Sequence, residues 1–443
     1  MTKTNDNKIN NGMSYIDYSY TRPKKAAVLK NWHNSYLNGE PFHEKKELIT
    51  ESYDNATILP IRRFPEDNLL FGRGGLVDKN NNYVALSAID NRVQFSYEFN
   101  NPVVKDEKVV YGGYLVCQWG HFLVEAVSRL WYALENDTTI DKYVFFLSQD
   151  EEREATGNYK EFFQLLGIWD KIEIINKPTQ YREVIVPELS YKWRTYFSQY
   201  YKKIFDTIAN NIKISPQWQA CDKIFFTRSQ LASASLTDIG TPMVDSFFLN
   251  NNYKIISPEK ISLSELIFLI RNAKECAAVS GTLPHNMLFG NDNQKLTIIE
   301  RNILNNEIQS DINNIRQLNT TYVDANLGLY TVNLGFGPFL LCYKGLFEKY
   351  AKDNGLNPPD SQYTSDKYIK KCFQKYMKTY KQVYHYEWFM FDWSIKYTDY
   401  QREAYLDSLN YVGDYIYGRK PFKLSHYFEL HYIKQIVKSI IGR

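Results

Sequence analysis

Three residues with acid–base or charge-binding side chains follow one another at intervals of four: His121, Glu125 and Arg129, in the segment GHFLVEAVSRL. On a regular helix this spacing puts them on one narrow face, while Phe122 and Leu130 turn toward the core. A carboxylate that holds an imidazole gives a base near neutral pH, which suits removal of a proton from a hydroxyl group. The spacing is equally that of a plain ion-pair ladder at a helix edge, and it supports both interpretations.

A second pattern, VSGTLPHN at residues 279–286, places a Gly turn between a short apolar strand and a helix with Pro284 in its first turn. Proline fits there because the N–H that it lacks has no partner in a first turn. Such a junction points backbone N–H groups at an anion and can hold a diphosphate without a metal. An ordinary turn between strand and helix looks the same, and the segment taken alone favours that interpretation.

Two single charges end strands of the same series. Arg228 ends KIFFTR, and Glu300 ends KLTIIE, a position where an acidic side chain commonly accepts hydrogen bonds from ribose hydroxyls. The sequence contains no GxxxxGK[ST] motif, and GRGG at 72–75 is not a dinucleotide fingerprint. It also lacks an Asp-x-Asp pair that could hold a cation against a diphosphate. We therefore expect side chains and helix N-termini to neutralise a bound diphosphate, with no metal and no organic cofactor.

Two series of alternating strands and helices must position these residues. The first has strands at 109–116, 142–148, 171–176 and 182–187, with helices at 120–135 and 158–169. The second has strands at 223–228, 253–258, 276–281 and 295–301, with helices at 261–274 and from 284. Ser262 and Glu265 form a capping box that marks the start of the helix at 261–274. This alternation predicts parallel sheets with a substrate beyond their carboxyl ends, in a cleft between the two series.

Composition narrows the class of protein. The 443 residues are 44% hydrophobic and 23% charged, which predicts a globular chain of two or three domains. A net charge of +3 is too small to indicate nucleic-acid binding. Five dispersed cysteines and a polar start without a signal peptide predict a cytoplasmic protein with free thiols. The 16% aromatic residues suit sugar rings, but the favoured interpretation is that they reflect the amino-acid usage of the source.

The chain ends in a short basic amphipathic segment, HYIKQIVKSIIGR at residues 431–443. Such a segment could rest on an anionic membrane surface, which would place the protein at the inner face of the cell membrane. More often such a tail packs against its own protein.

The order of the motifs resembles glycosyltransferase family 61 over about residues 105–305. The first half of that family carries a helix of the form (N/G)-H-(W/F)-L-x-(E/D)-x-x-P-R-L, which residues 120–130 match with Ser128 in place of the proline. The second half has a strand ending in S-R, matched by Thr227 and Arg228. Next comes (H)-G-(A/S)-G-L-(T/S)-N-x-L-F and then Ile-Glu, matched by 280–289 and 299–300. Ser280, Leu283 and Ser229 stand where the family has His, Gly and a second Arg.

The resemblance implies an α/β fold of the GT-B type, with two Rossmann-like domains facing a cleft. Its parts would be an N-terminal arm at 1–50, an acceptor domain at 51–212, a nucleotide-sugar domain at 213–330 and a helical, aromatic-rich extension at 331–443. It also implies a metal-independent, inverting transfer of a sugar from a nucleotide diphosphate, often UDP-linked. The acceptor would be an oligosaccharide or polysaccharide, usually in the synthesis of bacterial capsular or surface polysaccharide.

The resemblance also implies roles for the residues above. Those that bind the donor would be Arg228, Ser280, Gly281, Thr282, His285, Asn286 and Glu300. The base would be Glu125 or His121, and Glu125 is slightly favoured because a cationic His is unfavourable near a helix N-terminus. Arg129 would contact the acceptor or support the structure. The alternatives are an inactive subunit of a polysaccharide assembly complex and a nucleotide-sugar epimerase of the same architecture.

Overall fold

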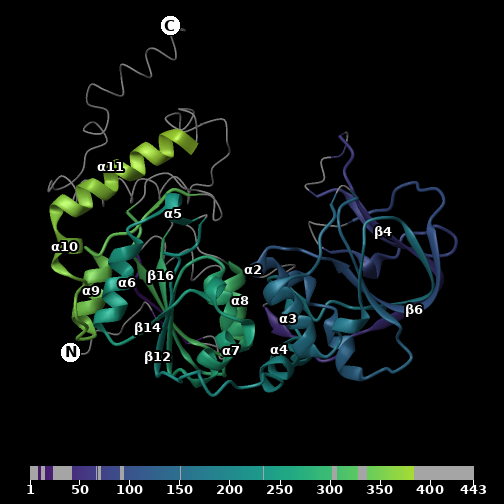
Figure 1. Cartoon of the computed structure of the whole chain (residues 1–443), viewed down its shortest axis with the longest axis horizontal. Helices are drawn as coiled ribbons and strands as arrows, with labels where there is room; N and C mark the ends of the chain where they lie inside the picture. Colours follow the sequence, from purple (N-terminus) through teal and green to yellow (C-terminus); the bar gives the residue numbers. More distant parts are fainter. Residues whose placement is uncertain are drawn as a thin grey trace, which may run out of the picture.

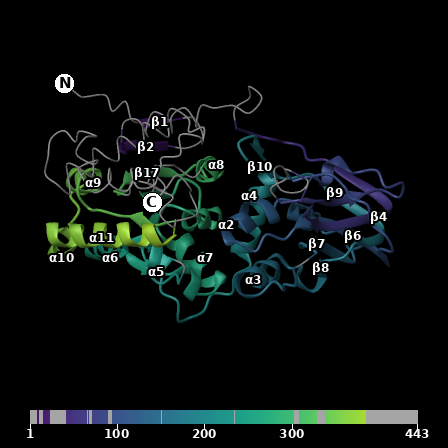
Figure 2. The same ribbon diagram turned by 90° about the horizontal axis from the view of Figure 1, so that it is seen from above.

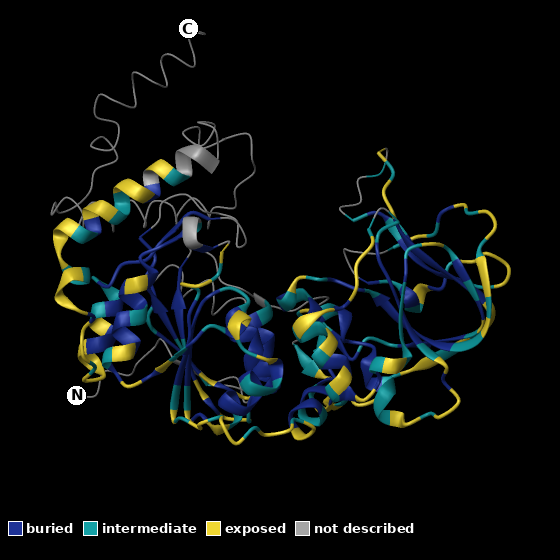
Figure 3. Cartoon of the chain, viewed as in Figure 1, coloured by how far each residue is buried: buried dark blue, intermediate teal, exposed yellow. Residues whose placement is uncertain are grey.

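A computed structural model of the chain describes residues 8–10, 15–22, 42–65, 67, 71–89, 94–149, 151–232, 234–301, 307–327 and 337–383. It contains two large β-sheets in two lobes that lie side by side, each with helices packed against its sheet (Figure 1). Much of both sheets is buried, whereas loops, outward helix faces and the outer parts of two strands of the first sheet are exposed (Figure 3). The predicted α/β class with parallel strands is therefore confirmed.

The sheet of the first lobe has six strands in the order β5-β4-β9-β6-β7-β8. They are β4 (Thr50–Arg62), β5 (Arg73–Val77), β6 (Val103–Tyr114), β7 (Lys142–Phe146), β8 (Ile172–Ile175) and β9 (Thr179–Pro187). The last four are parallel, in accordance with the predicted series. β4 pairs antiparallel with β5 and β9, and this antiparallel edge was not predicted.

The sheet of the second lobe has seven strands in the order β1-β2-β17-β16-β15-β12-β14. Its main strands are β12 (Lys223–Phe226), β14 (Lys254–Ile256), β15 (Glu275–Val279), β16 (Lys295–Glu300) and β17 (Asn319–Asp324). These five are parallel, and in chain order they have the doubly wound arrangement 2-1-3-4-5. In such a sheet ligands bind at the carboxyl ends of the two strands where the winding reverses, here β12 and β15.

The N-terminal residues contribute two strands to the second sheet. β2 (Tyr15–Tyr20) pairs parallel with β17, and β1 (Lys8–Asn10) pairs antiparallel with β2 (Figure 2). Ile16 and Tyr18 are fully buried, and the Tyr18 ring stacks on Tyr322 at 5.3 Å between centroids. The segment that we assigned to an arm thus completes a sheet built mainly from residues 200 positions later in the chain.

The described part of the C-terminal extension is helical and packs on the second lobe. It comprises α9 (Leu346–Asp353), α10 (Ser361–Thr364) and α11 (Asp366–Val383), preceded by the short strand β18 (Phe339–Leu340), which pairs with β13 (Asp238–Ile239). α11 lies beyond the ends of the sheet strands, next to α5 (Ala234–Thr237) (Figure 1). The basic segment 431–443 lies outside the described residues. Among the described residues, no helix is long and apolar enough to cross a membrane.

The helices that cover the sheets include α3 (Gly157–Leu166), α4 (Gln199–Asn210), α6 (Thr241–Asn250), α7 (Leu263–Asn272) and α8 (Glu307–Ile315). The predicted start of α7 is confirmed, because the Ser262 hydroxyl accepts a hydrogen bond of 3.1 Å from the Glu265 N–H. Between the two sheets, α3 and α4 of the first lobe face α7 and α8 of the second (Figure 1). One hydrophobic core runs through this contact, with the rings of Phe205 and Phe289 5.2 Å apart.

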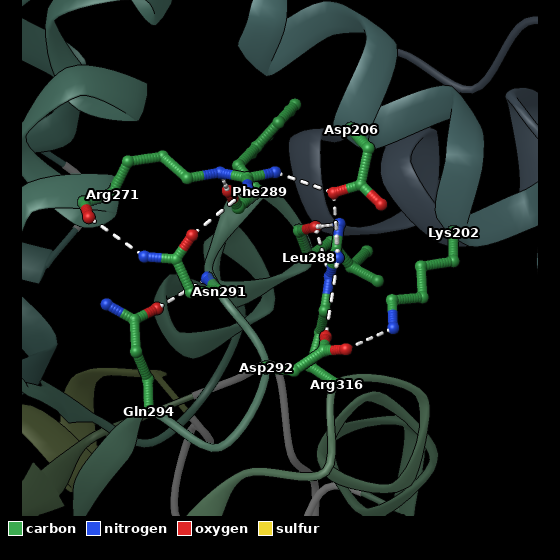
Figure 4. Close-up of polar contacts among 9 residues, drawn as sticks. All are labelled: Lys202, Asp206, Arg271, Leu288, Phe289, Asn291, Asp292, Gln294 and Arg316. Atoms are coloured by element: carbon green, nitrogen blue, oxygen red, sulfur yellow. Dashed lines mark hydrogen bonds and ion pairs between the residues drawn. The ribbon is translucent and has the colours of Figure 1, made fainter.

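A polar network joins the same two lobes at the edge of this core (Figure 4). Asp206 of α4 accepts hydrogen bonds from Arg271 of α7 at 2.6 Å and from Arg316 at 2.9 Å. Arg316, whose side chain is only 2% exposed, also donates to the Leu288 carbonyl at 2.8 Å. Burial alone would raise the pKa of Asp206, but Arg316 and Arg271 outweigh that effect and lower it. The carboxylate is thus the shared counter-ion of two guanidinium groups in the second lobe.

We expect Asp206→Asn to lower the free energy of unfolding by about 1–3 kcal/mol at pH 7, because the buried Arg316 guanidinium loses the nearer of its two carboxylates and keeps Asp292 at 3.6 Å. A lowered pKa contributes stability above the unfolded-state value near 3.9, and this contribution disappears as pH falls through the native pKa. The difference between wild type and variant should therefore shrink below about pH 4. Urea unfolding at pH 7 and pH 3.5 measures both effects. Asp222→Asn is the control, because Asp222 pairs with Lys274 on the surface. Equal urea midpoints for the two variants at pH 7 would show that the network adds no stability.

Candidate functional site

His121 and Glu125 are in direct contact. His121 ends α2 (Trp119–His121), and a single π-helical turn (Phe122–Ala126) carries Glu125. The Nδ1 atom of His121 lies 2.6 Å from Oε1 of Glu125, and the two side chains are 31% and 21% exposed. Because a carboxylate accepts hydrogen bonds, this contact favours the tautomer with the proton on Nδ1 and Nε2 as the basic nitrogen. The arrangement is a carboxylate–imidazole pair that solvent can reach.

Arg129 does not share a face with this pair, so the predicted three-residue stripe is wrong at its third member. Its guanidinium is buried over the Tyr111 ring and donates to the carbonyls of Leu86 at 2.8 Å and Ala88 at 3.1 Å. The cause is local: the Val127 N–H bonds to the Phe122 carbonyl, five residues back, and the helix then changes to 3-10 geometry at Leu130–Glu135. Arg129 therefore has a structural role in the first lobe.

Ser128 helps to explain why this helix is irregular. Its buried hydroxyl donates to the Tyr191 carbonyl at 3.0 Å and accepts from the Tyr191 N–H at 2.9 Å. Its own carbonyl accepts from the Ser190 N–H at 2.9 Å. The backbone after Glu125 is thus tied to β10 (Tyr191–Lys192) instead of continuing a regular helical ladder.

The second motif forms a tight loop at the carboxyl end of β15. Gly281 has a φ of 128°, a conformation that favours glycine, and a Cβ there would lie 2.9 Å from Nη2 of Arg301 and would displace that guanidinium. The Ser280 hydroxyl accepts from the Arg301 N–H at 3.1 Å. The helix that follows, η6 (Leu283–Phe289), is a seven-residue 3-10 helix rather than the expected α-helix. Gly281 and Thr282 remain partly exposed and form the accessible part of the motif.

His285 and Asn286 are buried, and their side chains form hydrogen bonds inside the protein. His285 Nδ1 lies 2.8 Å from Oε1 of Gln309, and burial lowers the pKa of His285 to about 4, with His121 acting in the same direction. The imidazole is therefore neutral at pH 7. The Asn286 side chain accepts from Nε1 of Trp119 at 2.8 Å and donates to the Leu283 carbonyl at 2.8 Å. The structure places these two residues behind the loop that we predicted to bind a diphosphate.

The two motifs, 160 residues apart in the sequence, touch each other. A Cβ added at Gly120 would lie 2.4 Å from Cγ2 of Thr282 and 3.2 Å from Cδ2 of His285. The hydrogen bond from Trp119 to Asn286 spans the same contact. The His121–Glu125 pair of the first lobe therefore lies next to the 280–282 loop, at one of the two strands where the winding of the second sheet reverses.

Arg228 lies at the other of these strands, just after β12, and shares Asp238 with a second arginine. Nε of Arg228 is 2.5 Å from Oδ2 of Asp238, and Nη1 of Arg301 is 3.0 and 3.1 Å from the two carboxylate oxygens. Burial lowers the pKa of Arg301 to about 10, which leaves it protonated at pH 7. The sequence prediction omitted Arg301, although it directly follows β16 as Arg228 closely follows β12.

A pocket of about 330 Å³ opens beside this arginine pair. It is lined by Arg228, Ser229, Ala234, Asp238, Ile239, Gly240, Thr241, Pro242, Tyr368, Lys371, Cys372 and Lys375. Arg301 lies behind it and connects it to the 280–282 loop through Ser280 and Gly281. The 280–282 loop therefore adjoins both features, since Thr282 lies next to Gly120 and Gly281 lies next to Arg301.

Glu300 lies elsewhere. It is 1% exposed and is not among the residues that line the pocket. Burial is the main cause of the raised pKa of Tyr18 on β2, and Tyr322 and then Glu300 raise it further. Successive residues of a strand point to opposite faces. Arg301 lies on the side of the pocket, where it pairs with Asp238. Glu300 therefore does not lie where it could contact a ribose bound in this pocket.

Residues 119–298 match the family model described as Glycosyltransferase 61. The match runs from the start of α2 into β16, so it includes the His121–Glu125 pair, Arg228 and the 280–282 loop. No curated protein matches the chain. In the part of the chain that the structure describes, no group of three or more His, Cys, Asp or Glu residues could hold a metal ion. Because the family model spans both motifs in their observed order, residues 119–298 of this chain are a glycosyltransferase family 61 domain.

Proposed function

We propose that the chain is an inverting glycosyltransferase. It would move a sugar from a nucleotide diphosphate onto a hydroxyl of an acceptor oligosaccharide or polysaccharide, and UDP is the first nucleotide to test. Family membership supports sugar transfer. The observation that carries the rest is the contact between Gly120 and Thr282. It supports a site in which the carboxylate–imidazole pair lies next to the 280–282 loop, whose Gly281 adjoins Arg301 behind the arginine-lined pocket. A sugar above the loop would have a base on one face and a cationic site for its leaving group on the other.

The donor diphosphate would occupy the pocket at the carboxyl end of β12. Arg228 lines that pocket, and Arg301 reinforces it from behind through Asp238. Guanidinium groups bind phosphate oxygens with strong, charge-assisted hydrogen bonds. They would also stabilise the negative charge that develops on the leaving diphosphate, so no metal ion is needed for that purpose.

The acceptor hydroxyl would approach from the side of the first lobe. Its oxygen attacks the anomeric carbon as the bond from that carbon to the diphosphate oxygen breaks, and the electron pair leaves with the nucleotide diphosphate. The hydroxyl proton goes to Nε2 of His121, and Glu125 stabilises the imidazolium through Nδ1. We now favour His121 as the base, because the helix-terminus argument against it assumed a regular helix, whereas α2 has three residues.

We also propose domain roles and a cellular role from the same family match. The two lobes would act as the acceptor and donor domains of a GT-B enzyme, working in the cytoplasm on bacterial capsular or surface polysaccharide. The basic segment 431–443 would give the protein a peripheral contact with the membrane. An inactive assembly subunit would bind UDP without transfer, and an epimerase would act on a nucleotide sugar without an acceptor.

The direct test of the donor site is titration of UDP in the presence of EDTA. Wild type should bind UDP without a divalent cation, and Arg228→Ala should weaken binding by about 2–4 kcal/mol, the cost of a buried charged hydrogen bond. Arg182→Ala is a control, because that arginine is half exposed and pairs with Asp106 on the first lobe. Unchanged UDP affinity in Arg228→Ala would remove Arg228 from the donor site. Binding and transfer that require added Mn²⁺ or Mg²⁺ would contradict the metal-independent mechanism.

A further inference from the structure

One wall of the arginine-lined pocket comes from α11, a helix that begins 68 residues after the end of the family match. Tyr368, Lys371, Cys372 and Lys375 line the pocket from this helix. Their spacing of three and four residues places them on a single helix face. Figures 1 and 2 show α11 lying along the second lobe, over the region of α5 and α6. Ile369 and Tyr376 are buried and fix the helix in this position.

The charges around the pocket do not balance. Among the residues that the structure describes, its lining carries three cations, Arg228, Lys371 and Lys375, and one carboxylate, Asp238. Asp238 is buried and already forms ion pairs with both Arg228 and Arg301. Nε of Arg301 is buried and has no hydrogen-bond partner within the described part of the chain, and the guanidinium lies 4.0 Å from the centroid of the Phe339 ring. The pocket therefore has an excess of positive charge that a bound anion would neutralise.

The nearby carboxylates do not remove this excess. Asp245, behind Thr227, accepts a hydrogen bond of 2.6 Å from the Thr227 hydroxyl, and burial raises its pKa. Glu300 is the last residue of β16 and does not line the pocket. Asp366, at the start of α11, pairs with Lys344 instead of Lys371 or Lys375. The side chains of Lys371 and Lys375 are exposed, so they can reach a ligand at the mouth of the pocket.

We propose that Lys371 and Lys375 of α11 are the outer cations of a diphosphate site whose inner cations are Arg228 and Arg301. This inference rests on the proposed function for the identity of the natural ligand, but the site itself is defined by its charge and shape. At about 330 Å³ the pocket is at the lower end of the range for small-molecule sites, which suits a diphosphate with part of its nucleoside. Donor binding would then depend on a helix outside the family-matched region, and α11 would close the donor site from its solvent side.

The test compares two double variants of the full chain by calorimetric titration with inorganic pyrophosphate, UDP and uridine. Lys371→Ala/Lys375→Ala removes the two cations that line the pocket. Lys367→Ala/Lys370→Ala is the matched control, because it removes two exposed lysines of the same helix that do not line it. We expect the first variant to raise the Kd for pyrophosphate and UDP by about 10- to 100-fold and the control by less than about twofold. The first variant should also show a weaker dependence of affinity on salt.

The inference is overturned if the two double variants bind pyrophosphate and UDP alike, or if wild type binds neither. It is also overturned if uridine affinity falls as much as UDP affinity, since α11 would then contact the nucleoside. A pocket variant that loses pyrophosphate binding supports the site even if no acceptor is ever glycosylated, in which case only the proposed function fails. A pocket variant that transfers sugar with wild-type kcat and KM would remove the lysines and leave the proposed function standing.

Discussion

His121→Ala is expected to lower kcat for sugar transfer by about 10²–10⁴-fold, with the Kd for UDP changed by less than about threefold. The reason is that His121 would take the acceptor proton and does not line the donor pocket. Its Nδ1 is held at 2.6 Å by Glu125, which orients the ring toward proton transfer at Nε2. The measurement is a single-turnover transfer assay at saturating donor, paired with a UDP titration of the same variant.

The variant Glu125→Gln distinguishes the role of Glu125 from that of His121. The amide can still accept from Nδ1 but cannot stabilise an imidazolium, so we expect a loss of turnover smaller than that of His121→Ala and a shift of the pH profile. If Glu125→Gln loses more turnover than His121→Ala, then Glu125 is itself the base. If either variant keeps wild-type turnover, that residue is structural, and the ion-pair interpretation of this helix is correct.

Gly120→Ala is expected to lower kcat/KM by at least about 100-fold, because small displacements of catalytic groups carry costs of that size. The added methyl would lie 2.4 Å from Cγ2 and 2.9 Å from Cβ of Thr282, so the base and the 280–282 loop would have to move apart. The double variant Gly120→Ala/Thr282→Gly removes both clashing carbons and should regain part of the activity.

The control for this variant is Gly355→Ala. Gly355 has a φ of 63°, and a Cβ there would meet nothing within 4 Å, so alanine adds backbone strain far from the site without a clash. We expect it to cost about 1–2 kcal/mol of stability and to leave kcat/KM unchanged. Wild-type activity in Gly120→Ala would show that the contact between the two motifs is not needed for transfer.

Local patterns predicted most of the parallel strands. β7, β8, β12, β14 and β16 fall within the predicted apolar runs, because buried strands are nearly continuous hydrophobic segments. β9 and β15 overlap their predicted runs but begin three residues and one residue earlier. β4 was missed because half of its residues alternate with exposed polar ones, as in TESYDNA. β2 was missed because YIDYSY stands among polar residues, and only its partner β17, about 300 residues away, makes it a strand.

The sequence predicted part of the site, and the errors of that prediction have a common origin. Spacing correctly predicted the contact between His121 and Glu125, which depends on one helical turn. It failed for Arg129, because a bond from Ser128 to Tyr191 changes the helix that the spacing assumed to be regular. Arg301 was overlooked although it ends the predicted strand at 295–301. The α11 lysines could not be found from motifs, since they reach the pocket only through the packing of α11. Tertiary contacts of this kind leave no periodic signal in the sequence.

The most direct measurement is a crystal structure of the protein with UDP bound, grown without divalent cations. We expect the diphosphate to lie between Arg228 and the lysines of α11, with its terminal phosphate toward the 280–282 loop and His121 next to that loop. Electron density for UDP elsewhere, or a diphosphate held by a metal ion instead of these cations, would contradict the account.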